Sequence, residues 1–324
     1  MNEFKESLLI LYSTPLYVIL IGLEILMTHI HNKHHYSVKG TVENIYLSFL
    51  NMGIDILLRG VCLFVLDWFF RFHKVEIHQP FWYWFVLFIG QDFLFYVLHC
   101  VDHYVRFFWA VHVTHHSSEE FNLTVGFRSS VFQPLYRFIY FIPLALAGFK
   151  GMDIMFMYSL VQIYGILIHT QLINKLGLLE WVLATPSHHR VHHCSNPEYI
   201  DKNMGMALII WDRLFGTFRE ESVPVKYGLT ENIKSHHPKE VLFHEWKKIV
   251  ADVKDAPTFH DKFQYLFGKP GWKHDKEKSL STSTVITPIQ NTTESRLFQE
   301  EFTYCTPSPT DEISISEATS VTMS

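Results

Sequence analysis

Three short histidine clusters are the residues of this chain best suited to chemistry. Their members are His99 and His103, then His112, His115 and His116, then His189, His192 and His193. Within each cluster the spacing is i, i+3 or i+4, and residues at these spacings share one face of an α-helix. We therefore expect three helical segments to present eight imidazoles toward a common point, enough for two metal ions with four ligands each.

The number of imidazoles indicates the kind of metal site better than the ligand type does. Imidazole binds zinc, copper, iron and nickel, so it selects none of them. A structural zinc site is complete with four ligands, and a single catalytic zinc needs only three. Eight imidazoles without matching carboxylates therefore predict a dinuclear redox centre. We expect two iron ions there, because iron is the available metal that activates O₂. Zinc can still fill such a site as an artefact, because it binds more tightly than ferrous iron.

Four further residues are candidates near these clusters. His169 ends the fifth apolar block, where an imidazole facing lipid would be costly, so it points inward as either a ninth ligand or a structural residue. Asp92 precedes the first cluster on the same helix face, and a carboxylate commonly orients a ligand imidazole. Asn122 either orients a ligand or water or packs in its loop. His188 is a ligand, an orienting donor or a bystander, and we favour the bystander.

The other histidines lack this pattern. We expect a solvated loop for His29, His31, His34 and His35, and structural roles for His73, His78, His244, His260 and His274. Among 21 histidines, the three clusters therefore stand apart.

Five apolar blocks are the elements that must position the clusters. They cover roughly residues 7–27, 45–70, 81–98, 131–149 and 152–173, and each has about the 17 to 25 residues needed to cross a bilayer as a helix. The first block lacks the features of a cleaved signal peptide, so we expect a membrane anchor. Blocks two and three form one hairpin and blocks four and five another, so all three clusters should lie on one side of the membrane. Either hairpin could be re-entrant instead of crossing fully, which would leave the clusters on the same side. The expected fold is an all-α, multi-span transmembrane helical bundle.

Basic residues in the short loops orient this bundle. The cluster side carries Lys33, Lys39, Arg106 and Arg128, and the other side carries Lys5, Arg71, Lys74 and Lys150. The basic residues of the C-terminal half add to the cluster side, which predicts that the histidines face the cytoplasm. The membrane would be the endoplasmic reticulum in a eukaryotic host and the inner membrane in a bacterial one.

The remainder of the chain predicts a cap and a tail. Residues 174–273 are mixed in character and are expected to form a cytoplasmic helical cap that completes the dinuclear site, so that 1–273 make one domain. Residues 274–324 are rich in Ser and Thr and predict a disordered tail. The net charge is −5, and no basic stripe with interleaved aromatics occurs, which excludes nucleic acid as an expected partner.

The clusters carry a resemblance to a known family. The pattern His99-x₃-His103, then Trp109-x₂-His112-x₂-His115-His116, then His189-x₂-His192-His193 resembles the fatty acid hydroxylase and sterol desaturase superfamily of membrane di-iron oxygenases. The order and the spacing of the motifs both agree. The resemblance implies that the eight histidines hold two iron ions and that the protein oxidises a C–H bond of a lipid with O₂.

Within that superfamily, the chain is most similar to the ether-lipid monooxygenases. The similarity is carried by the segments 115–123, 185–193, 200–203, 209–217 and 227–230. It implies hydroxylation of the ether-linked carbon of an alkylglycerol with tetrahydrobiopterin, giving a hemiacetal that releases a fatty aldehyde. The first cluster departs from that pattern, because Cys100 and Tyr104 replace an Arg and a Glu.

Two alternatives stay open. The same di-iron core could act on a sterol, a fatty acyl chain or a carotenoid with electrons from a separate carrier protein, and the missing Glu keeps this alternative open. A zinc transporter or sensor is a different class, but transporter ligands are expected near the middle of the spans rather than at their ends. No fused haem, flavin or ferredoxin domain is recognisable, so a reduced pterin or a carrier protein must supply electrons. The residues that would bind the pterin are not predicted.

Overall fold

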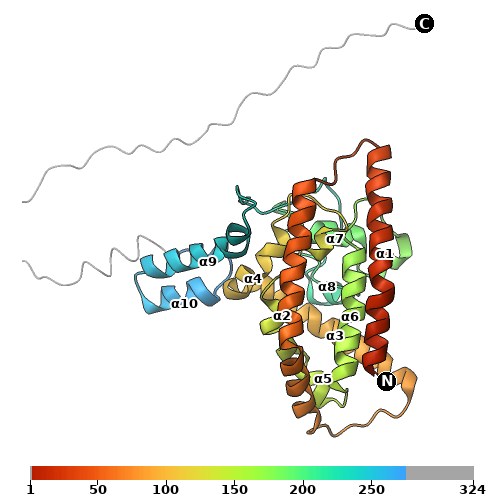
Figure 1. Ribbon diagram of the computed structural model, residues 1–324. Helices are drawn as coiled ribbons and strands as arrows, with labels where there is room; N and C mark the ends of the chain where they lie inside the picture. Colours follow the sequence, from red (N-terminus) through yellow and green to blue (C-terminus); the bar gives the residue numbers. More distant parts are fainter. Residues whose placement is uncertain (1, 275–324) are drawn as a thin grey trace, which may run out of the picture. The chain divides into compact units, whose positions relative to one another are not determined.

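The structure is a computed structural model that describes residues 2–274, and the regular secondary structure in this range is helical (Figure 1). Two isolated antiparallel bridges, Leu183 with Leu208 and Cys194 with Tyr227, are the extended pairings within it. The all-α prediction is confirmed for these residues. The tail predicted at 274–324 lies outside them apart from its first residue.

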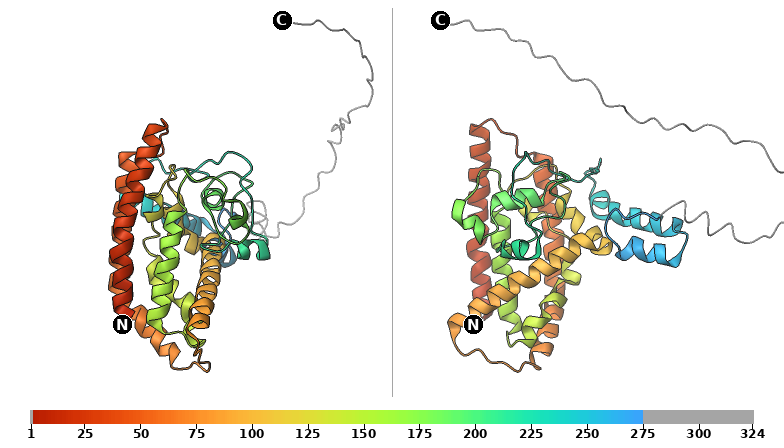
Figure 2. Two further views of the ribbon diagram at one scale, coloured as in Figure 1. Left: turned by 90° about the vertical axis from the view of Figure 1, so that its right-hand side faces the viewer. Right: turned by 180° about the vertical axis from the view of Figure 1, so that it is seen from behind.

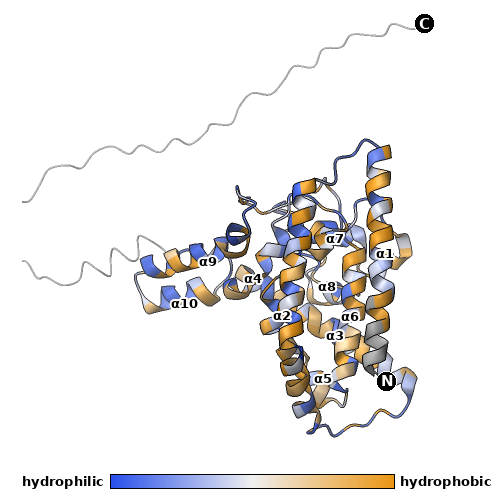
Figure 3. Cartoon of the chain, viewed as in Figure 1, coloured by the Kyte–Doolittle hydropathy of each residue, from blue (hydrophilic) through white to orange (hydrophobic). Residues whose placement is uncertain are grey.

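Three long helices match the first three predicted spans. They are α1 (Asn2–Ile30), α2 (Val38–Phe70) and α3 (Pro80–Tyr104), and each contains a segment long and apolar enough to cross a membrane. The side chain of Ser37 caps the start of α2, and Pro80 occupies the first turn of α3, where its missing N–H costs nothing. Figure 3 shows hydrophobic residues along most of α2 and a mixture on later helices.

The predicted fourth span, 131–149, is wrong. This segment forms the short pieces η2 (Gln133–Leu135), η3 (Arg137–Phe141) and α5 (Ile142–Leu146). Pro134 and Pro143 lack an N–H donor, which limits a continuous helix. Its polar side chains also turn inward, since Gln133 and Tyr136 each donate a hydrogen bond of 2.7 Å to Asp102 of α3. The segment therefore lines the core of the bundle.

The predicted fifth span, 152–173, is shorter in the structure. It is α6 (Gly151–Leu167), whose 17 residues fall short of the three candidate spans. Just after the helix, the Nδ1 atom of His169 lies 2.7 Å from the Gly165 carbonyl of α6, and Thr170 donates to Glu24 of α1. The side chain of Glu24 is buried in α1, and the apolar pattern of that helix did not predict this role.

Shorter helices surround the upper part of the bundle in Figure 1. They are α4 (Arg106–His116), η1 (Val125–Phe127), η4 (Gly177–Trp181), α7 (Pro186–His192), α8 (Ile210–Phe215), α9 (Pro238–Asp255) and α10 (Phe259–Phe267). The region predicted as a helical cap, 174–273, thus contains five of these elements joined by long irregular segments. The helices α9 and α10 pack against α4 and run sideways from α1 and α2 (Figure 2).

Candidate metal centre

Four segments bring nine histidines together. The C-terminal end of α3, the helix α4, the helix α7 and the residues after α6 each contribute at least one. The nine form two groups in which the ligand atoms lie within 4.8 Å of one another: the five-histidine group of His99, His103, His112, His116 and His192, and the four-histidine group of His115, His169, His189 and His193. The structure thus brings together all eight clustered histidines and His169. Eight of the nine are buried, and His115 is partly exposed.

Backbone carbonyls hold the far side of several rings. The Nδ1 atoms lie 2.7 Å from the carbonyl of Met204 for His99, 2.7 Å from that of Arg128 for His115, 2.7 Å from that of Gly165 for His169, and 3.0 Å from that of Lys202 for His192. A carbonyl can only accept a hydrogen bond, so each of these Nδ1 atoms carries the proton. The Nε2 atom then has a free lone pair, as a metal ligand requires.

The Nε2 atoms converge within each group. They lie 3.1 Å apart for His99 and His112, 3.1 Å for His112 and His116, 3.1 Å for His169 and His193, and 2.9 Å for His169 and His189. Ligand nitrogens about 2.0–2.1 Å from one metal ion stand at such separations from each other. The Nε2 atoms of His103 and His192 are also buried without a hydrogen-bond partner. Both groups therefore fit one metal ion each.

Burial keeps the imidazoles of α4 and α7 neutral. It lowers the pKa of His115 to about 4 and lowers the pKa values of His112, His116, His189 and His192 well below 6.5, with neighbouring histidines adding to the effect for the latter four. A charged imidazole would lose its hydration in this interior. The neutral form is also the form that binds a metal, so the site is ready to accept one near neutral pH.

Two polar side chains touch the remaining Nδ1 atoms of the five-histidine group. Asp201 places Oδ1 at 3.4 Å from Nδ1 of His103, and Ser130 places its hydroxyl at 3.0 Å from Nδ1 of His112. The carboxylate of Asp102 lies 3.8 Å from the same nitrogen of His112. Sequence reasoning missed Asp201, although it lies close after the third cluster. Its backbone has a positive φ of 57°, which Asp tolerates better than most residues.

Two buried carboxylates hold the turn that anchors His99. Asp212 accepts hydrogen bonds from the backbone N–H groups of Met204 (2.7 Å) and Gly205 (2.8 Å). Asp92 accepts from the N–H of Ala207 at 2.9 Å, and also from Leu208 and the indole of Trp211. Asp92 was expected to orient an imidazole directly. It instead acts through the backbone, because the 204–208 turn lies between it and the ligand.

The other two candidates bond to backbone groups and not to the clustered imidazoles. His188 lies at the start of α7, where its Nδ1 accepts from the backbone N–H of Thr185 at 3.3 Å in a capping box. Asn122 donates to the carbonyl of His35 and accepts from the N–H of Thr124 at 3.0 Å. Tyr104, one of the two departures in the first cluster, has its hydroxyl 3.4 Å from the Asp201 carbonyl.

The two groups face different surroundings. The five-histidine group borders a pocket of about 780 Å³, which we call the polar pocket for its charged residues. Its lining combines the apolar Trp109, Val113, Ile200 and Leu229 with the charged Arg106, Asp201, Glu231, Glu245, Lys248, Asp252, Lys269 and Lys273. The four-histidine group lies against Phe121, whose ring centre is 5.3 Å from that of His193 and 5.5 Å from that of His169. The ring of Tyr227 stacks on Phe121 at 4.9 Å. The five-histidine group therefore borders an open pocket, whereas His169 and His193 of the four-histidine group pack against aromatic rings.

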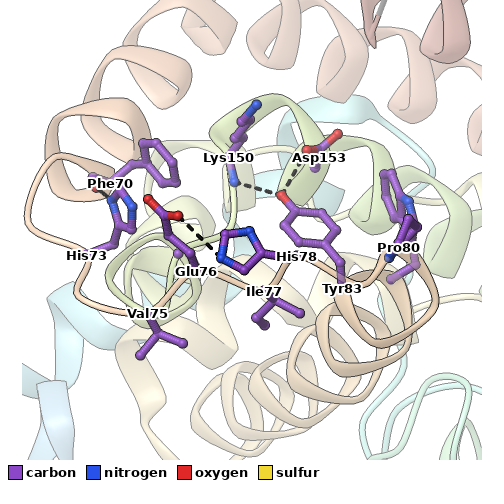
Figure 4. Close-up of a pocket in the computed structure, with 12 residues that line it drawn as sticks. Phe70, His73, Val75, Glu76, Ile77, His78, Pro80, Tyr83, Lys150 and Asp153 are labelled. Carbon is purple, nitrogen blue, oxygen red and sulfur yellow. Dashed lines mark hydrogen bonds and ion pairs between the residues drawn. The ribbon is translucent and has the colours of Figure 1, made fainter.

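A second pocket, of about 470 Å³, lies at the far end of α3 (Figure 4). Tyr83 donates to Asp153 at 2.9 Å and accepts from the backbone N–H of Lys150 at 3.1 Å. Dashed lines mark both contacts in Figure 4. His73 and His78 line it, and neither belongs to a metal-type group among residues 2–274. This pocket provides no rival metal site.

Comparison with known proteins shows the family to which the histidine-containing region belongs. Residues 84–217, which include all nine histidines, match the family model described as fatty acid hydroxylase. This region belongs to the fatty acid hydroxylase family. The residues that match extend from the start of α3 to the end of the turn after α8. The family domain therefore contains both histidine groups and the two carboxylates that hold the 204–208 turn.

The chain is also similar to curated relatives over stretches longer than residues 84–217. The chain is 42% identical to alkylglycerol monooxygenase of Homo sapiens over 64% of this chain and 46% of the relative, and 34% identical to that of Danio rerio over 82% and 60%. It is 27% identical to lathosterol oxidase of Mus musculus over 46% and 49%. The chain thus spans about half the length of the first of these relatives. No solved structure matches it.

Proposed function

We propose that the two histidine groups hold a pair of iron ions and that the chain is an integral-membrane monooxygenase acting on a lipid C–H bond with O₂. The observation that carries this proposal is the convergence of buried Nε2 atoms in two groups that contain only histidine. When bound, the iron pair would supply O₂ activation. The ligands would be His99, His103, His112, His116 and His192 for one ion and His115, His169, His189 and His193 for the other.

The residues of the chain would orient the ligands and exclude water. Backbone carbonyls such as those of Met204 and Arg128 keep the rings fixed, so a reacting lipid meets a preorganised centre. Phe121 and Tyr227 shield the four-histidine group from solvent. The difficult chemistry belongs to the metal, and the contribution of the protein is binding and positioning.

The substrate we propose is an alkylglycerol, oxidised at its ether-linked carbon with tetrahydrobiopterin as the electron donor. The similarity to alkylglycerol monooxygenases over most of the described residues supports this choice. The polar pocket beside His103, His116 and His192 supports a water-soluble reductant, because it joins the five-histidine group to solvent through a charged lining. The same pocket would face the cytoplasm, at the endoplasmic reticulum of a eukaryote or the inner membrane of a bacterium.

A second candidate is hydroxylation or desaturation of a sterol or fatty acyl chain with a separate electron-carrier protein. The similarity to lathosterol oxidase favours it, as do Cys100 and Tyr104 in the first cluster. A zinc transporter or sensor is disfavoured, because both groups lie at helix ends and are enclosed by carbonyl-anchored rings rather than placed along a span.

The test is release of fatty aldehyde from a labelled alkylglycerol by membranes that contain this protein, with and without tetrahydrobiopterin. We expect pterin-dependent aldehyde that disappears in a His189→Ala variant of matched abundance, because only three imidazoles remain in its group. A preparation that binds two iron ions per chain but forms no aldehyde would refute the ether-lipid assignment. Assays with sterol or fatty acyl substrates and a reduced carrier protein would then test the second candidate.

A further inference from the structure

The helix α10 exposes a row of phenylalanines. Phe259, Phe263 and Phe267 are 83%, 51% and 45% exposed, and they are spaced four residues apart, so they share one face of the helix. The buried residue Tyr265 lies on the opposite side of α10. Three exposed aromatic rings in a row are unusual on a water-facing helix, and such a patch marks a binding surface.

The neighbouring helix α9 also has an exposed side. Phe243 and Val250 are exposed there and lie two turns apart, with the exposed Lys247 between them and Lys254 after them. The other side of α9 is polar and lines the pocket beside the five-histidine group with Glu245 and Lys248. The hairpin of α9 and α10 is therefore two-sided, with an aromatic face and a polar face. Figure 3 shows the mixture of hydrophobic and hydrophilic residues on both helices.

The aromatic face adjoins the spans. Phe107 of α4 has ring contacts with Trp246 of α9 at 5.1 Å and with Phe267 of α10 at 6.0 Å. Phe243 contacts Phe132 at 5.7 Å, and the next residues along that segment include the exposed Leu135. Ring contacts therefore connect the hairpin to the side of the helical bundle.

The distance along α2 from the level of the hairpin to the end of α2 matches the thickness of a bilayer. Val241 and Leu242 near the start of α9 pack in one cluster with Leu47 and Leu50 of α2. The helix α2 continues from Leu50 to its end at Phe70, and at 1.5 Å per residue that distance is about 30 Å. The hydrocarbon core of a bilayer is also about 30 Å thick. If the end of α2 lies at one surface of the membrane, the hairpin lies at the other.

We propose that the α9–α10 hairpin lies on the bilayer surface, with its aromatic face (Phe243, Val250, Phe259, Phe263 and Phe267) inserted among the lipids. Exposed Lys254 and Lys262 flank this face, where they would reach lipid headgroups while their stems lie along apolar surface. An apolar face with basic flanks is the pattern of helices that lie in the membrane interface. The lipid bilayer, rather than a protein partner, is therefore the occupant.

This placement sets the depth of the metal centre. The helices α9 and α10 both pack on α4, which carries three of the nine histidines. A hairpin held at the interface holds α4 there as well, so the two groups would meet the headgroup end of a lipid rather than the middle of its chain. This consequence rests on the proposed function, whereas the surface contact itself requires only that the chain spans a membrane.

A fluorescent probe can test the contact in the full chain, reconstituted in nanodiscs of phosphatidylcholine with some phosphatidylglycerol. An environment-sensitive fluorophore is attached to a Phe263→Cys variant and, as the matched control, to a Lys248→Cys variant on the polar face of α9. The parent chain gives the background from native thiols. We expect lipids that carry a doxyl group to quench the probe at position 263 at least twofold more than the probe at 248, and aqueous iodide to show the reverse.

Equal quenching of both probes by iodide would overturn the proposal. A probe at position 263 that is shielded from iodide but not quenched by doxyl lipid would also overturn it, because protein rather than lipid would then cover the face. A Phe259→Cys variant repeats the measurement at the most exposed ring of the row, in case substitution at 263 disturbs folding. None of these readings needs turnover, so failure of the oxygenase assignment would leave them interpretable.

Discussion

The five-histidine group borders an open pocket lined by charged residues, whereas the four-histidine group lies under the stacked rings of Phe121 and Tyr227. Both groups use buried imidazoles, and both anchor rings through backbone carbonyls. The two groups differ in what borders them and in the number of imidazoles that remain when one is lost. The first group keeps four imidazoles after losing one, and the second keeps three. The same residue type can therefore build one position beside a pocket and one beside aromatic rings within a single centre.

Removal of one ligand from each group should give the largest effect. We expect His189→Ala to lower the metal content by about one ion per chain and to lower turnover more than about 100-fold, because only three imidazoles remain in that group. His116→Ala leaves four imidazoles in its group and should retain both ions. Metal analysis of the two purified variants checks this. Equal loss of metal from both would show that the groups do not act as separate sites.

Removal of Asp212 should weaken the five-histidine group selectively. Asp212→Ala leaves the buried N–H groups of Met204 and Gly205 without an acceptor, so we expect a loss of about 2–4 kcal/mol in the free energy of unfolding. The anchor of His99 would move with this turn. Denaturation in detergent, with the exposed Asp255→Ala as the control, measures the effect. If both variants have the same stability, the turn does not depend on this carboxylate.

Filling the polar pocket should separate the entry of the soluble reductant from the binding of the lipid. Leu229 lines that pocket, and Leu229→Trp would occupy part of its volume. We expect the KM for the soluble reductant to rise about tenfold while the KM for the lipid changes little, because only one ligand uses this entrance. The same change at the exposed Leu178 is the control. A rise in the KM for the lipid alone would reverse the assignment of the pocket.

The smallest effect is expected at Tyr227. Its hydroxyl is buried without a hydrogen-bond partner, and its ring makes the contact with Phe121. Tyr227→Phe preserves that ring contact, so we expect a change below about 0.5 kcal/mol in stability and below about twofold in turnover. Unfolding and steady-state measurements on the variant check both values. A large loss of turnover with normal stability would instead assign the hydroxyl a direct role beside the four-histidine group.

Local pattern was enough to predict the helical class, three of the spans and the eight clustered histidines that the structure brings together. These features depend on spacing within one helix or on the length of one apolar run, and both are visible in the chain. The prediction of the fourth span was wrong because it, too, used only the length of one apolar run. Its composition is apolar, but apolar residues fill a protein core as readily as they face lipid, and Gln133 and Tyr136 needed Asp102 as a partner from another helix.

The sequence by itself determined which residues could bind metal, because imidazoles at helical spacing need no distant partner to share a face. Only the tertiary structure decided how the histidines divide into the two groups. His115 and His116 are adjacent, yet they belong to different groups, since neighbouring residues on a helix point about 100° apart and different segments meet each side. His169 joins the four-histidine group, Asp201 contacts His103, and Asp212 holds the turn that anchors His99. These contacts also depend on packing between different segments of the chain. Spacing along one helix cannot encode such contacts.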